Sequence, residues 1–110
     1  VNLSSGAAKL GSPHQYVDYA ATKGAIDTLT IGLGKEVAGE GIRVNGVRAG
    51  LIDPAIHASG GKPNRVAELL PEVPLQRAGS ADEVAQAIAW LLSDAASYMT
   101  GSLVDVTGGR

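Results

Sequence analysis

The pattern of hydrophobic and polar positions predicts two long helices in this 110-residue chain. The first begins near Tyr16, and its apolar residues recur at helical spacing until the Gly-Glu-Gly segment 39–41 ends it. These apolar residues are Ile26, Leu29, Leu33 and Val37. The second helix follows a capping box formed by Ser80 and Glu83. One of its faces carries Val84, Ala87, Ile88, Leu91 and Leu92.

Short runs rich in β-branched residues predict three strands, at residues 1–5, 42–47 and 102–106. Residues 6–15 read as a loop, and residues 48–65 as a long irregular loop followed by a short helix near 65–70. The order is strand, helix, strand, helix, strand. This order indicates an α/β fold with parallel crossovers.

Three strands and two long helices make an incomplete sheet. A buried parallel sheet needs helices on both faces, and two helices cannot easily cover both. The first strand also starts at residue 1, which leaves its outer edge without a predicted neighbour. We therefore expect the chain to be part of a larger fold.

The composition argues against several classes of function, including nucleic-acid binding and membrane proteins. The net charge is −2 and the nine Lys and Arg residues are scattered, which argues against nucleic-acid binding. The chain has no cysteine, so disulfides and thiolate metal sites are excluded. Its apolar runs are too short to span a membrane, and no signal peptide opens it. We expect a cytoplasmic location.

The segment YVDYAATKGA at residues 16–25 is the best candidate for chemistry. On a helix, residues four apart share a face, so Lys23 meets Tyr19, while Tyr16 meets Ala20. An ammonium group one turn away favours the phenolate form of a tyrosine. Ser5, after the first strand, could donate a hydrogen bond at the same point. The alternative is a solvated surface pair, which this spacing alone favours.

Four motifs that occur in order along the chain favour a catalytic role over a surface pair. They are VNLSSGAA, YAATKGA, GIRVNGVRAG and DVTGG. Together they resemble the C-terminal half of the short-chain dehydrogenase/reductase family. The resemblance implies the C-terminal part of a Rossmann-like, doubly wound parallel sheet. It implies that residues 1–110 are the catalytic half of a single domain, with the N-terminal dinucleotide-binding half absent.

The resemblance also implies roles for individual residues. Tyr19 would exchange a proton with the substrate oxygen and lie against the cofactor, and Lys23 would favour its phenolate and bind the nicotinamide ribose. Ser5, rather than Ser4, would orient the substrate. Gly50 and Ile52 would contact the nicotinamide. The implied activity is NAD- or NADP-dependent interconversion of an alcohol and a carbonyl compound, of the aldehyde, ketone or 3-oxoacyl type.

Two positions depart from the family pattern. Ala49 replaces its usual proline, and Pro54 replaces a threonine whose hydroxyl would bind the cofactor. The sequence also lacks a Gly-rich strand-to-helix turn for a pyrophosphate. Two weaker candidates are a zinc site at His14 and His57, which lacks a third ligand, and a substrate-covering loop around His57 and Ser59.

The resemblance finally implies a homodimer or homotetramer. The family uses the helix that carries Tyr19 for one subunit contact, and the last helix and last strand for another. The small residues Ala20, Ala21, Gly24 and Ala25 would allow another helix to approach closely. Trp90 lies off the apolar stripe of the second long helix, and we expect it to be either a core residue or a subunit contact. The alternative function is an inactive remnant that serves only as an oligomerisation or interaction module.

Overall fold

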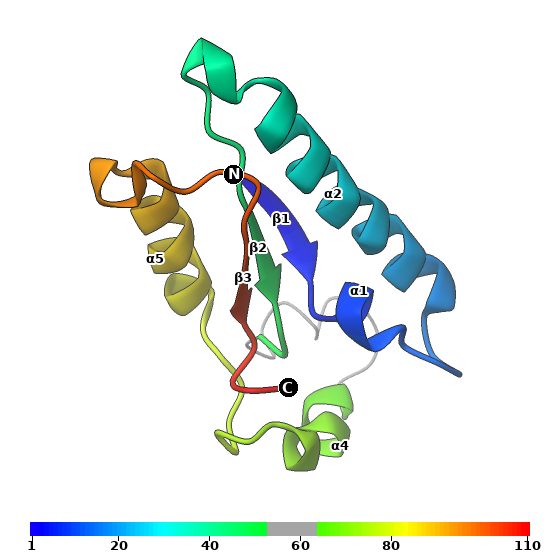
Figure 1. Ribbon diagram of the computed structural model, residues 1–110. Helices are drawn as coiled ribbons and strands as arrows, with labels where there is room; N and C mark the ends of the chain where they lie inside the picture. The colour runs from blue at the N-terminus through cyan, green and yellow to red at the C-terminus, as the bar shows by residue number, and fades with distance from the viewer. Residues whose placement is uncertain (53–63) are drawn as a thin grey trace.

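A small parallel sheet lies between two helices in the computed structural model, which describes residues 1–52 and 64–110 (Figure 1). The strands are β1 (Asn2–Ser5), β2 (Gly46–Ala49) and β3 (Leu103–Val106). The long helices are α2 (Val17–Glu36) and α5 (Ala81–Leu92), and the short ones are α1 (Ala7–Leu10) and α4 (Arg65–Leu69). Single 3₁₀ turns are η1 (Ala38–Glu40), η3 (Leu70–Glu72) and η4 (Asp94–Ala96). The predicted α/β class and its two long helices are confirmed.

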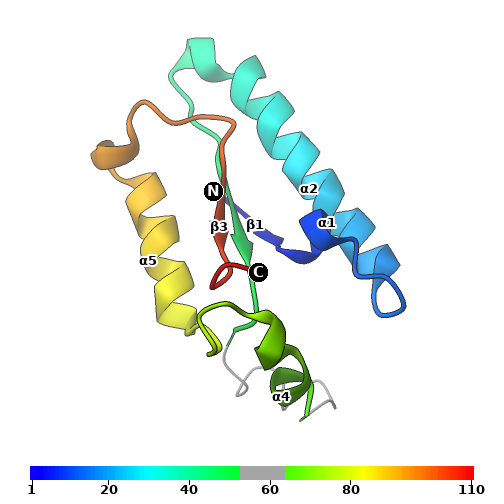
Figure 2. The same ribbon diagram turned by 60° about the horizontal axis from the view of Figure 1, so that its bottom comes forward.

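The strands are parallel and their order is β1-β2-β3. Leu3 pairs with Val47, which pairs with Val104, so these three residues share one face of the sheet. Helix α5 covers this face and α2 covers the opposite one (Figures 1 and 2). Leu3 on the edge strand is still 52% exposed. The expected incomplete coverage is therefore confirmed at β1.

Apolar side chains fill the layer between the sheet and α5. Val47, Val84, Leu91 and Ala96 form its buried centre, and Ala87, Ile88 and Val104 pack around them. The stripe predicted for α5 is correct except at Leu92, which is 64% exposed. Trp90 is 48% exposed, so it is not a core residue of the described structure.

The capping box of α5 is present and includes an arginine that the sequence did not suggest. Ser80 Oγ accepts the Glu83 N–H, and the Glu83 carboxylate accepts the Ser80 N–H. Arg77 also donates to both oxygens of this carboxylate, at 2.9 and 2.6 Å. The bonds from Arg77, followed by the one from the Ser80 backbone, lower the pKa of Glu83 from 4.5 to about 2.

We expect the contribution of Glu83 to stability to depend on pH. Because its pKa is lower in the folded state, the stabilisation is present above pH 4.5 and is lost as the pH falls towards 2. Glu83→Gln should therefore unfold at a lower urea concentration than the wild type at pH 7, with the difference shrinking between pH 4.5 and 2. A difference that does not change over this range would show that the carboxylate charge contributes nothing.

The layer between the sheet and α2 is polar and thin instead. The buried residues of α2 are Ala20, Asp27, Thr30 and Gly34. The apolar stripe that predicted this helix does not supply its buried contacts, and Leu29 of that stripe is 53% exposed. Gly34 lies against the backbone of Gly101, where an added Cβ would be only 2.6 Å from the Gly101 nitrogen. The close approach of this helix to the strands requires small residues.

Gly34→Ala should lower the free energy of unfolding by about 1–3 kcal/mol, because the new methyl group collides with backbone that cannot rotate away. Gly32→Ala is the matched control two residues earlier in the same helix. A Cβ at Gly32 meets nothing within 4 Å, so this change should stabilise the helix by about 0.5–1 kcal/mol. Urea unfolding measures both, and equal effects would contradict the packing.

Two sequence predictions of local structure were wrong. Residues 42–45 do not belong to the second strand, because they are bound by the segment that precedes β3. The Val44 N–H donates to Thr100 Oγ1 at 3.1 Å, Asn45 Nδ2 donates to the Met99 carbonyl, and Asn45 Oδ1 accepts the Ser102 N–H. Asn45 therefore has a structural role, joining residues 42–45 to the segment before β3. The predicted loop at residues 6–15 contains helix α1, which ends at Gly11 in the left-handed conformation (φ 75°).

Candidate functional site

A cavity of about 550 Å³ lies at the carboxyl ends of the strands. Helices α1 and α4 and the C-terminus are at this end of the sheet (Figures 1 and 2). The cavity brings together Ser5 after β1, Tyr19 in the first turn of α2, and Gly50 after β2. Loops at the carboxyl ends of parallel strands are where open α/β sheets bind ligands. Three of the predicted site residues therefore share one cavity.

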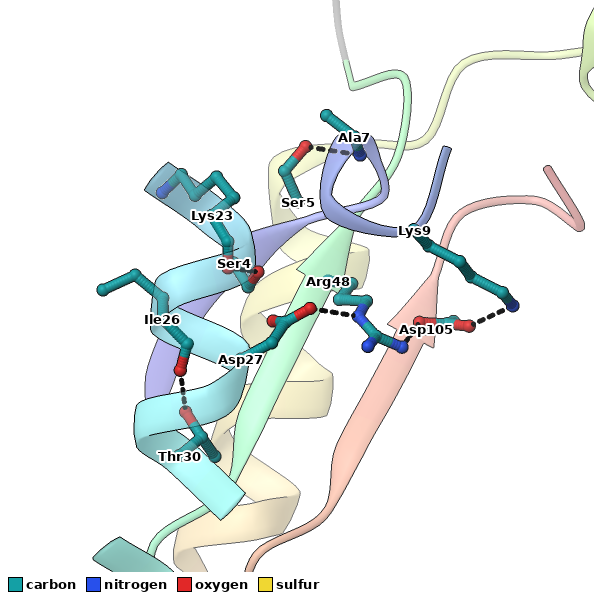
Figure 3. Close-up of polar contacts among 10 residues, drawn as sticks. All are labelled: Ser4, Ser5, Ala7, Lys9, Lys23, Ile26, Asp27, Thr30, Arg48 and Asp105. Carbon is teal, nitrogen blue, oxygen red and sulfur yellow. Dashed lines mark hydrogen bonds and ion pairs between the residues drawn. The ribbon is translucent and has the colours of Figure 1, made fainter. Parts of the chain in front are cut away.

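Ser5 is better placed than Ser4 for a role in this cavity. Ser4 is 3% exposed, faces α2 and donates its hydroxyl hydrogen to the Lys23 carbonyl at 3.3 Å (Figure 3). Ser5 lines the cavity, and its Oγ accepts the Ala7 N–H at 3.1 Å. Since that bond uses an oxygen lone pair, the Ser5 hydroxyl keeps its hydrogen for donation to a bound group.

Tyr19 and Lys23 are neighbours, as the four-residue spacing predicts. The Lys23 ammonium lies 5.7 Å from the centre of the Tyr19 ring. It donates to the Leu3 carbonyl at 3.0 Å, which ties α2 to β1 beside the cavity. An ammonium group has three N–H donors, so this bond leaves Lys23 able to bind further hydroxyl groups. Tyr19 is 45% exposed and lines the cavity, whereas Lys23 is not among its lining residues.

The two expected nicotinamide contacts lie apart. Gly50 lines the cavity, and an added Cβ there would be 2.6 Å from Thr107 Cα, so a packing requirement also explains this glycine. Ile52 instead lines a second cavity on the side of α5, where it forms a parallel bridge with Gly79. Ala49 ends β2. Pro54 lies outside the described residues.

The cavity has further walls that the sequence did not predict. Helix α1 contributes Ala7 and Leu10, and α4 contributes Arg65 and Leu69. Tyr16, predicted only to lie near the start of the first long helix, also lines it. The amphipathic pattern near residues 65–70 predicted helix α4 but carried no signal that it would share a cavity with Tyr19, because the two lie far apart in the sequence.

An ion-pair network joins α1, α2, β2 and β3 (Figure 3). Arg48 on β2 binds Asp27 of α2 at 2.8 Å and Asp105 of β3 at 3.3 Å, and Lys9 of α1 binds Asp105 at 3.1 Å. Burial opposes these charges, but the hydrogen bonds outweigh it: they raise the pKa of Arg48 and lower that of Asp105. The network connects α1, which follows Ser5, to α2, which carries Tyr19.

Other candidates find less support. In residues 1–52 and 64–110, no three His, Asp or Glu side chains are grouped closely enough to hold a metal ion. His57 and Ser59 fall outside this part of the chain, so the proposed zinc and loop roles at these positions are not described by the structure. Among the described helices, none is both long and apolar enough to cross a membrane.

Comparison with known proteins gives consistent matches over the whole chain. A family model described as Enoyl-(Acyl carrier protein) reductase matches residues 1–110. The uncharacterized oxidoreductase YgfF of Escherichia coli is 64% identical over 110 residues, which are 100% of this chain and 44% of that protein. The 3-oxoacyl-(acyl-carrier-protein) reductase FabG of Thermotoga maritima is 41% identical over 110 residues, with 99% of this chain and 44% of that protein covered.

A solved structure supports the same relationship. The NADPH-bound short chain oxidoreductase of Pseudomonas aeruginosa PAO1, described as containing an atypical catalytic center, superposes with a TM-score of 0.83 at 30% identity. The match covers 97% of this chain and 43% of that one, so the chain spans less than half of these relatives. Family model, sequence identity and fold agree: the chain belongs to the short-chain dehydrogenase/reductase family and corresponds to the carboxyl-terminal part of its members.

Proposed function

We propose that this chain forms the proton-transfer part of an NAD- or NADP-dependent oxidoreductase that interconverts an alcohol and an aldehyde or ketone. The observation that supports it most directly is the shared cavity of Ser5 and Tyr19, with the Lys23 ammonium beside the Tyr19 ring. A surface pair on a solvated helix would not place the tyrosine in a cavity with a second hydroxyl group.

In the direction of reduction, the Tyr19 hydroxyl donates its proton to the carbonyl oxygen of the substrate. The Ser5 hydroxyl, whose oxygen is held by the Ala7 N–H, donates a hydrogen bond to the same oxygen and orients it. The Lys23 ammonium, 5.7 Å from the centre of the Tyr19 ring, attracts the negative charge that proton donation leaves there. In the direction of oxidation, the Tyr19 phenolate takes the proton of the alcohol.

The residues present fit the nicotinamide end of a dinucleotide. The ammonium of Lys23 can bind ribose hydroxyls with the donors that Leu3 does not use, and Tyr19 and Gly50 line the adjoining cavity. Ile52 is a further proposed contact. When bound, the cofactor supplies or accepts the hydride. The relatives are more than twice as long as this chain, which is consistent with a pyrophosphate site outside residues 1–110.

A homodimer or homotetramer is part of this proposal. Leu29 and Ile31 on α2 and Trp90 and Leu92 on α5 are large apolar side chains with at least 38% exposure. Apolar groups on two helices give surfaces that a second copy could cover. The same exposed residues are what favours the second candidate function, an interaction module without catalysis.

A titration with NADH and NADPH distinguishes the oxidoreductase from the interaction module. It is done on the full-length gene product that contains this sequence. If the protein is an oxidoreductase, the fluorescence of the reduced nicotinamide should change saturably as the cofactor binds. The protein should then reduce members of a panel of aldehydes and ketones. Saturable self-association without any cofactor binding would contradict the oxidoreductase and support the interaction module.

A further inference from the structure

We propose that Arg65 binds an anionic group of the substrate, a carboxylate or a phosphate, while the reacting carbonyl lies at Ser5 and Tyr19. This inference rests on the proposed oxidoreductase function and specifies the class of substrate. The predicted substrate is a small oxo or hydroxy compound with a negative charge at some distance from the reacting carbon.

The first argument is the charge of the cavity. Its charged lining residues, within the described part of the chain, are Arg65, Glu72 and Arg110. Glu72 and Arg110 neutralise each other, because the guanidinium contacts Glu72 Oε2 at 2.7 Å through Nη2 and at 3.0 Å through Nε. Of the ion pairs between described residues, none includes Arg65. Among the described side chains of the cavity, Arg65 is therefore the charged group without an ion-pair partner.

The second argument is the way in which Arg65 is held. Its guanidinium carbon lies 4.4 Å from the centre of the Tyr16 ring. This contact is a cation–π interaction and not a hydrogen bond to an oxygen acceptor. The contact thus restricts the side chain without consuming the donors that bind two oxygens of a carboxylate or phosphate. Arg65 is partly buried, which strengthens its interaction with an anion relative to an exposed arginine.

The third argument is the distribution of polar and apolar groups. Tyr16 immediately precedes α2 and lies three residues before Tyr19, so the stacked arginine is fixed close to the start of the helix that carries the reacting hydroxyl. The rest of the cavity is lined in part by Ala7, Leu10, Leu51 and Leu69. A volume of about 550 Å³ suits a small molecule. The arrangement fits a substrate with two polar ends and an apolar body.

Matched pairs of neutral and anionic carbonyl compounds test the inference on the full-length gene product. The carboxylate pairs are 4-oxopentanoate and 5-oxohexanoate, each against its methyl ester. The phosphate pair is dihydroxyacetone phosphate against dihydroxyacetone. We expect the anionic member of at least one pair to have a kcat/KM about tenfold or more above its neutral partner.

Arg65→Ala should raise the KM of the preferred anion about 10- to 100-fold and change the neutral partner less than about twofold. Arg65→Lys should recover part of the loss, since it keeps the charge but not the fork of donors. Tyr16→Leu should weaken the preference, whereas Tyr16→Phe keeps the stacking ring. Lys35→Ala, an exposed change at the far end of α2, is the control for net charge.

The inference is overturned if Arg65→Ala slows the anionic and neutral members equally, because that result indicates only a structural link between α4 and α2. It is also overturned if the neutral members are preferred throughout. Calorimetric binding of the same probes makes the test independent of turnover: the anionic member must bind more tightly, and Arg65→Ala must abolish the difference. Anion binding without any turnover would instead contradict the proposed oxidoreductase and leave the role of Arg65 standing.

Discussion

Tyr19→Phe is expected to reduce the kcat of the full-length gene product by about 10²- to 10⁴-fold, while the Kd of the nicotinamide cofactor changes little. The substitution removes the only hydroxyl group of this side chain and leaves its ring. The ring continues to fill the cavity and to lie beside the Lys23 ammonium, so the loss isolates proton transfer from binding. Steady-state kinetics combined with cofactor titration measures both quantities.

Tyr16→Phe is the matched control, because Tyr16 lines the same cavity and is three residues away. Its kcat should stay close to that of the wild type. Lys23→Ala should weaken both turnover and cofactor binding, since Lys23 is proposed to act on Tyr19 and on the ribose. Equal losses from the two tyrosine variants would exclude Tyr19 as the specific proton donor.

Arg48→Met is expected to lower the free energy of unfolding by about 3–5 kcal/mol, the largest stability effect that the structure predicts. Methionine retains much of the apolar stem of Arg48 but leaves the carboxylate of Asp27, which is only 7% exposed, without its cation. Asp27 Oδ1 already has no hydrogen-bond partner within the described residues. Losing the bond to Oδ2 would leave a buried charge uncompensated.

Lys9→Met serves as the control for this network. Lys9 also binds Asp105, but its side chain is 61% exposed, so water screens the pair and the change should cost at most about 1 kcal/mol. Chemical denaturation at pH 7 compares the two variants. If both changes had the same small effect, the Asp27–Arg48 pair would be no more important than a surface ion pair.

The sequence predicted the fold well where residues interact locally. The capping box of Ser80 and Glu83 marked the start of α5, and the β-branched runs located β1 and β3. The four-residue spacing placed Lys23 beside Tyr19. These features depend on helix and strand periodicity, which is visible in a short window of sequence.

Features that depend on distant partners were missed. Residues 42–45 resemble a strand in composition, but Asn45 is bound by Met99 and Ser102, which lie more than fifty positions later. The apolar stripe of α2 indicated a helix correctly, yet the residues that pack on the sheet are small or polar, such as Gly34 and Asp27. Likewise, nothing local to Arg65 revealed that it stacks on Tyr16.

The register of the sheet has a consequence for the kinetics of folding. Asn2 pairs with Gly46 and Gly46 with Leu103, so each strand pairing joins residues more than forty positions apart. The chain must close these long loops before any ladder hydrogen bond forms, whereas the helices α2 and α5 need only local contacts. We therefore expect the helices to form before the sheet, and overall folding to be slow compared with an all-helical chain of the same length. During that interval the unpaired strand segments are exposed, and they are the segments through which partly folded molecules would aggregate.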